Sequence, residues 1–119
     1  MLPFELAREL KSAGFTQSTE LDAVYALSEH LRIRRRDALR MWYGSKRKAG
    51  LAVELEQEAL YTPTLSELVT ACGKPLQLAC DGAGNWHASG LISDRQFVAD
   101  GETADESLAR LWLLMQQST

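Results

Sequence analysis

The stretch LQLACDGAGNWHASGLISDRQFVADGETADESLARLWLLMQQ, residues 76–117, decides the fold class of this chain. Residues 76–80, 86–90 and 95–99 are short runs of the apolar and aromatic residues that strands prefer, bounded by turn residues. The connection DGAGN, between the first two runs, contains glycine, aspartate and asparagine, which tolerate the positive φ of tight turns. We therefore expect three short strands in a small antiparallel sheet.

A helix is expected to close this stretch. Thr103 and Glu106 have the spacing of a capping box, and the acidic residues that open the segment suit the positive end of a helix dipole. Apolar residues then recur on one helical face: Leu108, Leu111, Trp112 and Met115.

Helical patterns also precede the sheet. Residues 3–14 carry apolar residues at helical spacing, and residues 64–73 begin with a second capping box, Thr64 with Glu67. Between them we expect a helix starting near Thr19 and a short one ending at Gly44. Residues 51–60 fit either a helix or a half-exposed strand.

This order predicts an α+β fold, in which N-terminal helices are followed by a small antiparallel three-stranded sheet covered by helices and by a closing C-terminal helix. A chain of 119 residues fits a single domain, 1–119. Within it, a basic helical half (1–50) differs in composition from the helix, three strands and helix of 62–119.

The positive charge of the chain is concentrated in one window. Residues 31–50 contain eight basic residues and one acidic residue, a net charge of +7, whereas the remainder has five basic and fifteen acidic residues, a net charge of −10. Such segregation projects a field that can steer a charged partner. The candidate binding residues are Arg32, Arg34, Arg35, Arg36, Arg40, Lys46, Arg47 and Lys48.

Three readings of this charge segregation remain open. Residues 24–44 can be aligned as a helix-turn-helix that would place arginines against duplex DNA, although Arg32 stands where the turn usually has glycine. Alternatively, the patch docks an acidic protein partner, or the acidic C-terminal half imitates nucleic acid. Trp86 and His87 are candidate interface aromatics, because large rigid rings make good anchors.

Several classes of function are not expected. The chain lacks a run of about 20 apolar residues, which a membrane span needs, and its N-terminus does not resemble a secretory signal. Cys72 and Cys80 lack metal-type spacing, and we expect them to be reduced and buried, with a disulfide as the alternative. These features favour a cytoplasmic protein. We also expect no cofactor, no metal and no catalytic residues, because neither histidine has the sequence neighbours of a nucleophile relay.

Two resemblances bear on function. LARELKSAGF near the start, YTPTLSELVTACG, and GETADESLARLWLLM at the end resemble a group of small uncharacterised phage and prophage proteins. The C-terminal part is similar to the HicB-like antitoxin fold, whose G-x-T-x-x-E turn is matched by Gly101, Thr103 and Glu106, with Ser107 in place of the usual alanine. The first resemblance implies a mobile-element origin and a compact α+β fold, and neither implies a chemistry.

We therefore expect a non-catalytic, phage-type binding protein that contacts a host macromolecule. A protein partner is the primary reading, for an adaptor or inhibitor, and duplex DNA the alternative, for a small regulator. Homodimerisation through the closing helix or a sheet edge is a further expectation.

Overall fold

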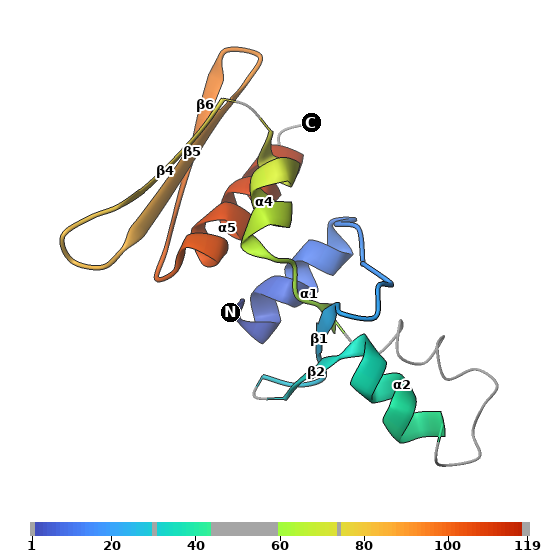
Figure 1. Ribbon diagram of the computed structural model, residues 1–119. Helices are drawn as coiled ribbons and strands as arrows, with labels where there is room; N and C mark the ends of the chain where they lie inside the picture. The colour runs from blue at the N-terminus through green and yellow to red at the C-terminus, as the bar shows by residue number, and fades with distance from the viewer. Residues whose placement is uncertain (1, 30, 44–59, 74, 118–119) are drawn as a thin grey trace.

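The computed structural model describes residues 2–29, 31–43, 60–73 and 75–117. Within these ranges the chain has four helices and two separate antiparallel sheets of three strands, so the expected α+β class is confirmed (Figure 1). In chain order the elements are α1 (Phe4–Ser12), β1 (Val24–Ala26), β2 (Arg32–Arg34), α2 (Arg35–Tyr43), β3 (Leu60–Tyr61), α4 (Leu65–Cys72), β4 (Leu76–Cys80), β5 (Trp86–Ile92), β6 (Arg95–Gly101) and α5 (Ala104–Gln117).

The C-terminal sheet has the order β4-β5-β6 and contains the three strands expected from the sequence. Ser93 and Asp94 join β5 to β6, with φ angles of 49° and 67°. A two-residue turn with both φ angles positive matches the twist of the strands that it joins, so it sets their register. That register places His87 opposite Asp100.

Helix α5 covers one face of this sheet, and its expected apolar face lies in the larger hydrophobic core. Helix α4 packs beside α5, and its capping box between Thr64 and Glu67 is confirmed. Of the two hydrogen bonds of the capping box expected at α5, one is formed: the Glu106 N–H donates to Thr103 Oγ1 over 3.3 Å. The Glu106 carboxylate instead pairs with Arg110, 2.7 Å away. The apolar face of α5 expected from the sequence is buried in this core, whereas Leu114 of the same helix is exposed, and homodimerisation stays a prediction.

Gly101, the last residue of β6, lies against the first turn of α5. A Cβ added there would lie 2.7 Å from the Ser107 backbone nitrogen and 3.0 Å from the Glu106 Cβ. The glycine and threonine of the G-x-T-x-x-E pattern therefore have structural roles. Gly101 permits close approach and Thr103 caps the helix.

Gly101→Ala should lower the free energy of unfolding by about 1–3 kcal/mol, because the added methyl group overlaps backbone that cannot move aside. Gly90→Ala is the matched control: its Cβ would meet the flexible end of Met115 at 2.8 Å, so we expect a smaller loss. Urea unfolding measures both. An equal or smaller loss for Gly101→Ala would contradict the close approach.

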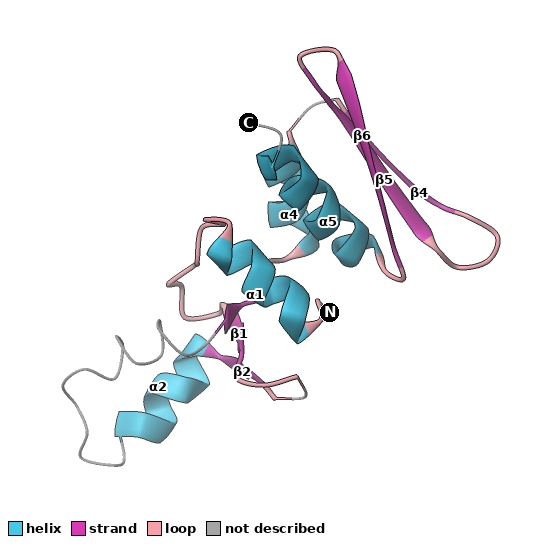
Figure 2. Ribbon diagram, turned by 180° about the vertical axis from the view of Figure 1, so that it is seen from behind, coloured by secondary structure: helices cyan, strands magenta, loops and turns pink. Residues whose placement is uncertain are grey.

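The segment after α1 differs from the expectation. The prediction of a helix from Thr19 is wrong, because β1 and β2 form a hairpin with Tyr25 opposite Ile33 (Figure 2). Strand β3 pairs with the other side of β1. Leu21 and Leu31, which the expected helix would place on one apolar face, are more than half exposed. The side chains that are buried instead are those of Ala23, Tyr25 and Ala26.

The physical reason is long-range pairing. Strand β1 is only three residues long, too short for a clear alternation, and its neighbour β3 comes from more than thirty residues further along the chain.

The short helix expected to end at Gly44 is confirmed as α2. Of the ambiguous segment, residues 51–59 lie outside the described ranges, and Leu60 is in β3.

Helix α1 lies between the two sheets (Figures 1 and 2). Leu6 and Leu10 enter the core formed with α4, α5 and the C-terminal sheet. Ala7 instead packs with Ala26 and Leu60 of the first sheet. The molecule is extended, 53 × 32 × 19 Å, with α2 and the C-terminal sheet at opposite ends. The N-terminal helix thus belongs to the same core as residues 62–117, so packing does not follow the compositional boundary near residue 50.

Candidate binding surfaces

Two of the predicted binding arginines are held within the fold. Arg32 is partly buried, and its guanidinium donates to the carbonyl oxygen of Leu2 at 2.8 Å and to that of Ser28 at 3.1 Å. Burial lowers the pKa of Arg32, an effect that nearby Glu29 opposes. Arg35 is 8% exposed and donates to the Tyr25 hydroxyl at 3.1 Å. These side chains stabilise the hairpin and the start of α2.

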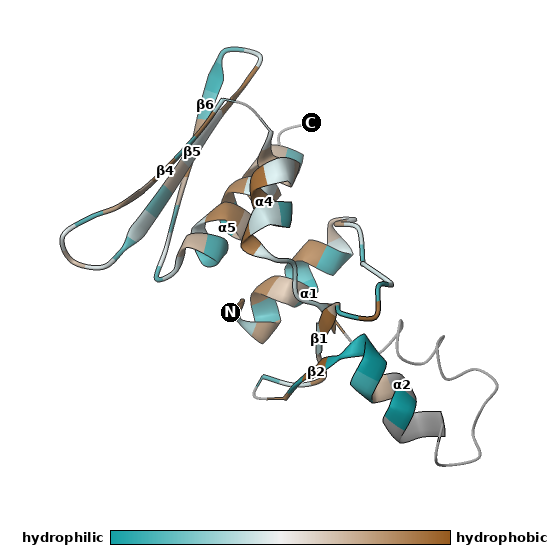
Figure 3. Ribbon diagram, in the orientation of Figure 1, coloured by the Kyte–Doolittle hydropathy of each residue, from teal (hydrophilic) through white to brown (hydrophobic). Residues whose placement is uncertain are grey.

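Three predicted arginines are exposed at the end of the molecule. Arg34 is on β2, while Arg36 and Arg40 are one turn apart on α2. Figure 3 shows that the described part of α2 is largely hydrophilic. Arg36 lies 3.2 Å from Asp22, an exposed pair whose energy is small and screened by salt. The other predicted residues of this patch, Lys46, Arg47 and Lys48, lie outside the described residues.

Arg35→Ala should lower the free energy of unfolding by about 1–2 kcal/mol, since it removes a buried hydrogen bond and the packing of a long side chain. Arg36→Ala removes the same charge one residue away and should cost less than about 0.5 kcal/mol. Chemical denaturation compares the two variants. Equal losses would show that Arg35 has no special structural role.

The helix-turn-helix prediction for residues 24–44 is wrong. A helix-turn-helix needs two packed helices, whereas Leu27 and Leu31 here close a hairpin through a 2.9 Å backbone hydrogen bond. The arginines of this segment are therefore presented by one strand and one helix.

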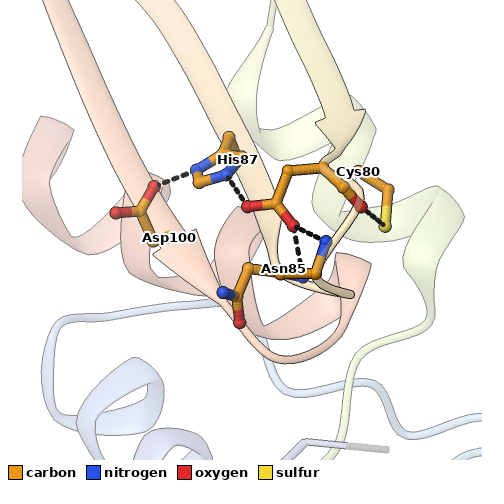
Figure 4. Close-up of polar contacts among 6 residues, drawn as sticks. Cys80, Asn85, His87 and Asp100 are labelled. Carbon is orange, nitrogen blue, oxygen red and sulfur yellow. Dashed lines mark hydrogen bonds and ion pairs between the residues drawn. The ribbon is translucent and has the colours of Figure 1, made fainter.

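His87 is the centre of a polar network on the C-terminal sheet (Figure 4). Its Nδ1 lies 2.5 Å from Asp100 Oδ1, and its Nε2 lies 3.0 Å from Asp81 Oδ2. The Asp81 Oδ1 atom accepts the backbone N–H groups of Ala83 and Asn85, at 2.8 and 3.0 Å. The network therefore joins the β4–β5 turn to β6.

The electrostatics of this network favour the doubly protonated ring. Hydrogen bonds to Asp100 and then to Asp81 raise the pKa of His87 above its ordinary 6.5. The pKa of Asp81 is lowered by its hydrogen bond to His87, then by the N–H groups of Asn85 and Ala83. In the protonated ring both nitrogens donate to carboxylates, and no lone pair is then left to act as a general base. The side chain is 43% exposed, so the group is on a surface and not in a deep cleft.

The sequence analysis found no relay partners for His87, and it did not predict that Asp81 and Asp100 contact the ring. The available signal was the Ser93–Asp94 connection: a two-residue turn there pairs His87 with Asp100 across the sheet. Asp81 is a turn residue, as the sequence predicts. Its contact with His87 depends on how the chain bends after β4, which the sequence does not show.

His87 should titrate above pH 6.5 in the folded protein, and Asp100→Asn should lower that pKa. Because the folded pKa of His87 is raised, its contribution to stability is complete below 6.5 and is lost as the pH rises through the folded pKa. The pKa of Asp81 is lowered in the folded protein, so Asp81 contributes to stability above pH 3.8. This contribution is lost as the pH falls through the folded pKa of Asp81. NMR titration of the ring protons tests this, and an unchanged His87 pKa in Asp100→Asn would contradict the network.

Trp86 and His87 do not form one surface. Strand alternation places Trp86 on the same face as buried Ala88, and His87 on the opposite, open face.

The two cysteines are free, as expected, but only Cys72 is buried; Cys80 is exposed. Burial raises the pKa of the Cys72 thiol to about 11, so it is protonated and unreactive.

No protein-family model, curated protein or solved structure matches this chain. Within the described ranges, no helix is both long enough and apolar enough to span a membrane. The same part of the chain holds no group of three metal-ligating side chains arranged to bind an ion.

Proposed function

We propose that this chain is a non-catalytic binding protein whose arginine-bearing end docks an acidic surface of a protein partner. The observation that carries the proposal is the exposure of Arg34, Arg36 and Arg40 together at the end formed by β2 and α2. We define these three residues as the arginine patch.

The position of the patch suits docking. Helix α2 is at an end of the extended molecule, away from the larger core (Figure 1). Among the described elements, a partner can therefore reach α2 without displacing the larger core. Arg36 and Arg40 are four residues apart and point to one side of the helix, so two guanidinium groups can contact neighbouring carboxylates.

The charge of the rest of the chain adds selectivity. In the sequence, the net charge of +7 over residues 31–50 contrasts with −10 elsewhere, and the exposed arginines of the described part attract an acidic partner that the acidic remainder repels. Within the described ranges three exposed arginines are available to contact phosphates, fewer than the roughly 6–10 phosphate contacts of a strongly salt-dependent duplex-binding protein. The patch therefore favours a compact acidic protein surface over duplex DNA. The resemblance to phage proteins supports a host protein as the partner.

Arg36→Ala with Arg40→Ala should weaken binding to the partner at least tenfold, because two charge-assisted contacts are lost. The matched control, Arg8→Ala with Arg95→Ala, removes the same charge from exposed positions elsewhere and should bind like the wild type. Tagged forms of all three are incubated with nuclease-treated bacterial lysate, and the retained proteins are quantified and identified by mass spectrometry.

An acidic protein retained by the wild type and the control, but not by the patch variant, would support the proposal. Equal retention by all three forms would contradict it. Fluorescence anisotropy with a labelled duplex tests the other class of partner: binding at low salt that the patch variant loses would assign the patch to DNA instead.

A further inference from the structure

A pocket of about 470 Å³ lies apart from both the arginine patch and the His87 network. It is formed where the loop after α1 meets α4 and α5. Its volume falls within the range of small-molecule sites, about 300–1,000 Å³. The lining residues are Phe15, Thr16, Ser18, Ser66, Glu67, Thr70, Ala71 and Trp112.

Two aromatic rings contribute the apolar part of the lining. Phe15 and Trp112 pack edge to face, with ring centroids 5.0 Å apart and planes at 76°. Both belong to the larger core and are less than a tenth exposed, so their positions are fixed by packing. A site with preorganised aromatic rings binds an apolar group without the cost of ordering its own side chains.

Glu67 contributes the charge. Its Oε1 accepts hydrogen bonds from the Tyr61 hydroxyl and from the hydroxyl and backbone N–H of Thr64. All three donors use the same oxygen, and no donor from the described part of the chain reaches Oε2. One carboxylate oxygen is thus left for a ligand while the other holds the residue in place.

The remaining polar groups of the pocket are neutral hydroxyls, and none of the described lining residues is basic. Hydroxyl oxygens can accept hydrogen bonds from an ammonium group. An anionic ligand would instead meet the Glu67 carboxylate without a compensating charge.

From this combination we infer that the pocket binds a small organic ammonium compound, with its charged group at Glu67 and its apolar body against Phe15 and Trp112. The inference is independent of the proposed protein partner, since it involves none of the residues of the arginine patch.

Phenethylammonium chloride is the probe, because it joins an ammonium group to one aromatic ring. Titration of the ¹⁵N-labelled full chain should give saturable shifts of the Trp112 indole N–H and of the Ser66 and Thr70 amides, with a Kd in the millimolar range or tighter. The neutral isostere 2-phenylethanol should bind at least tenfold more weakly, and 3-phenylpropionate should not bind measurably.

Glu67→Gln should weaken the probe at least tenfold while preserving the fold, because glutamine retains an acceptor for Tyr61 and remains compatible with a capping box. Ala71→Phe should block the pocket. Val69→Phe is its matched control, since Val69 is also exposed on α4 but does not line this pocket. Thermal unfolding of each variant shows whether the fold is retained.

Absence of Trp112 shifts at about 10 mM probe, a concentration that detects even millimolar Kd values, would overturn the inference. Equal binding of phenethylammonium and 2-phenylethanol, or undiminished binding by Glu67→Gln, would also overturn it, because the pocket would then recognise only an apolar body.

Discussion

The packing of α1 on two sides holds the two sheets together. Leu6 and Leu10 are buried against the C-terminal core, while Ala7 contacts Ala26 and Leu60 of the first sheet. Ala7 is fully buried and carries only a methyl group, which lets the helix approach that sheet closely. The first sheet is too small to bury a core alone, since isolated short strands are marginal in water. Its position, and with it that of the arginine patch, therefore depends on this helix.

The same constraint divides the basic segment into two kinds of residue. Arg32 reaches back to the Leu2 carbonyl, at the entry to α1, and Arg35 reaches Tyr25, so their charges serve the junction between hairpin and helix. Arg34, Arg36 and Arg40 remain at the surface. A concentration of arginines in the sequence is therefore not a measure of the binding surface, because a guanidinium with five donors is also a good partner for buried carbonyl and hydroxyl oxygens.

The two polar features of the C-terminal half differ in what they offer a ligand. In the His87 network both ring nitrogens already have carboxylate partners, so the group joins strands and a turn. At the pocket beside Glu67, three donors share one oxygen, and the aromatic rings behind it are fixed. The two features differ in whether their polar atoms already have hydrogen-bond partners: both nitrogens of His87 have them, whereas the donors around Glu67 all contact one of its two carboxylate oxygens.

The sequence by itself determined the C-terminal region, where the signals are local. Capping residues lie three positions from their partners, turn residues lie between the strands they join, and the apolar face of α5 repeats within one helix, so β4, β5, β6, α4 and α5 could all be predicted. Tertiary structure alone decided residues 19–34, because Tyr25 pairs with Tyr61 and Arg32 contacts Leu2 across about thirty residues or more. It also decided the pocket, whose walls come from three separate elements, and the network of His87, which forms only when the sheet register brings Asp100 opposite. Contacts between distant residues leave no local pattern, since they depend on which surfaces the folded chain brings together.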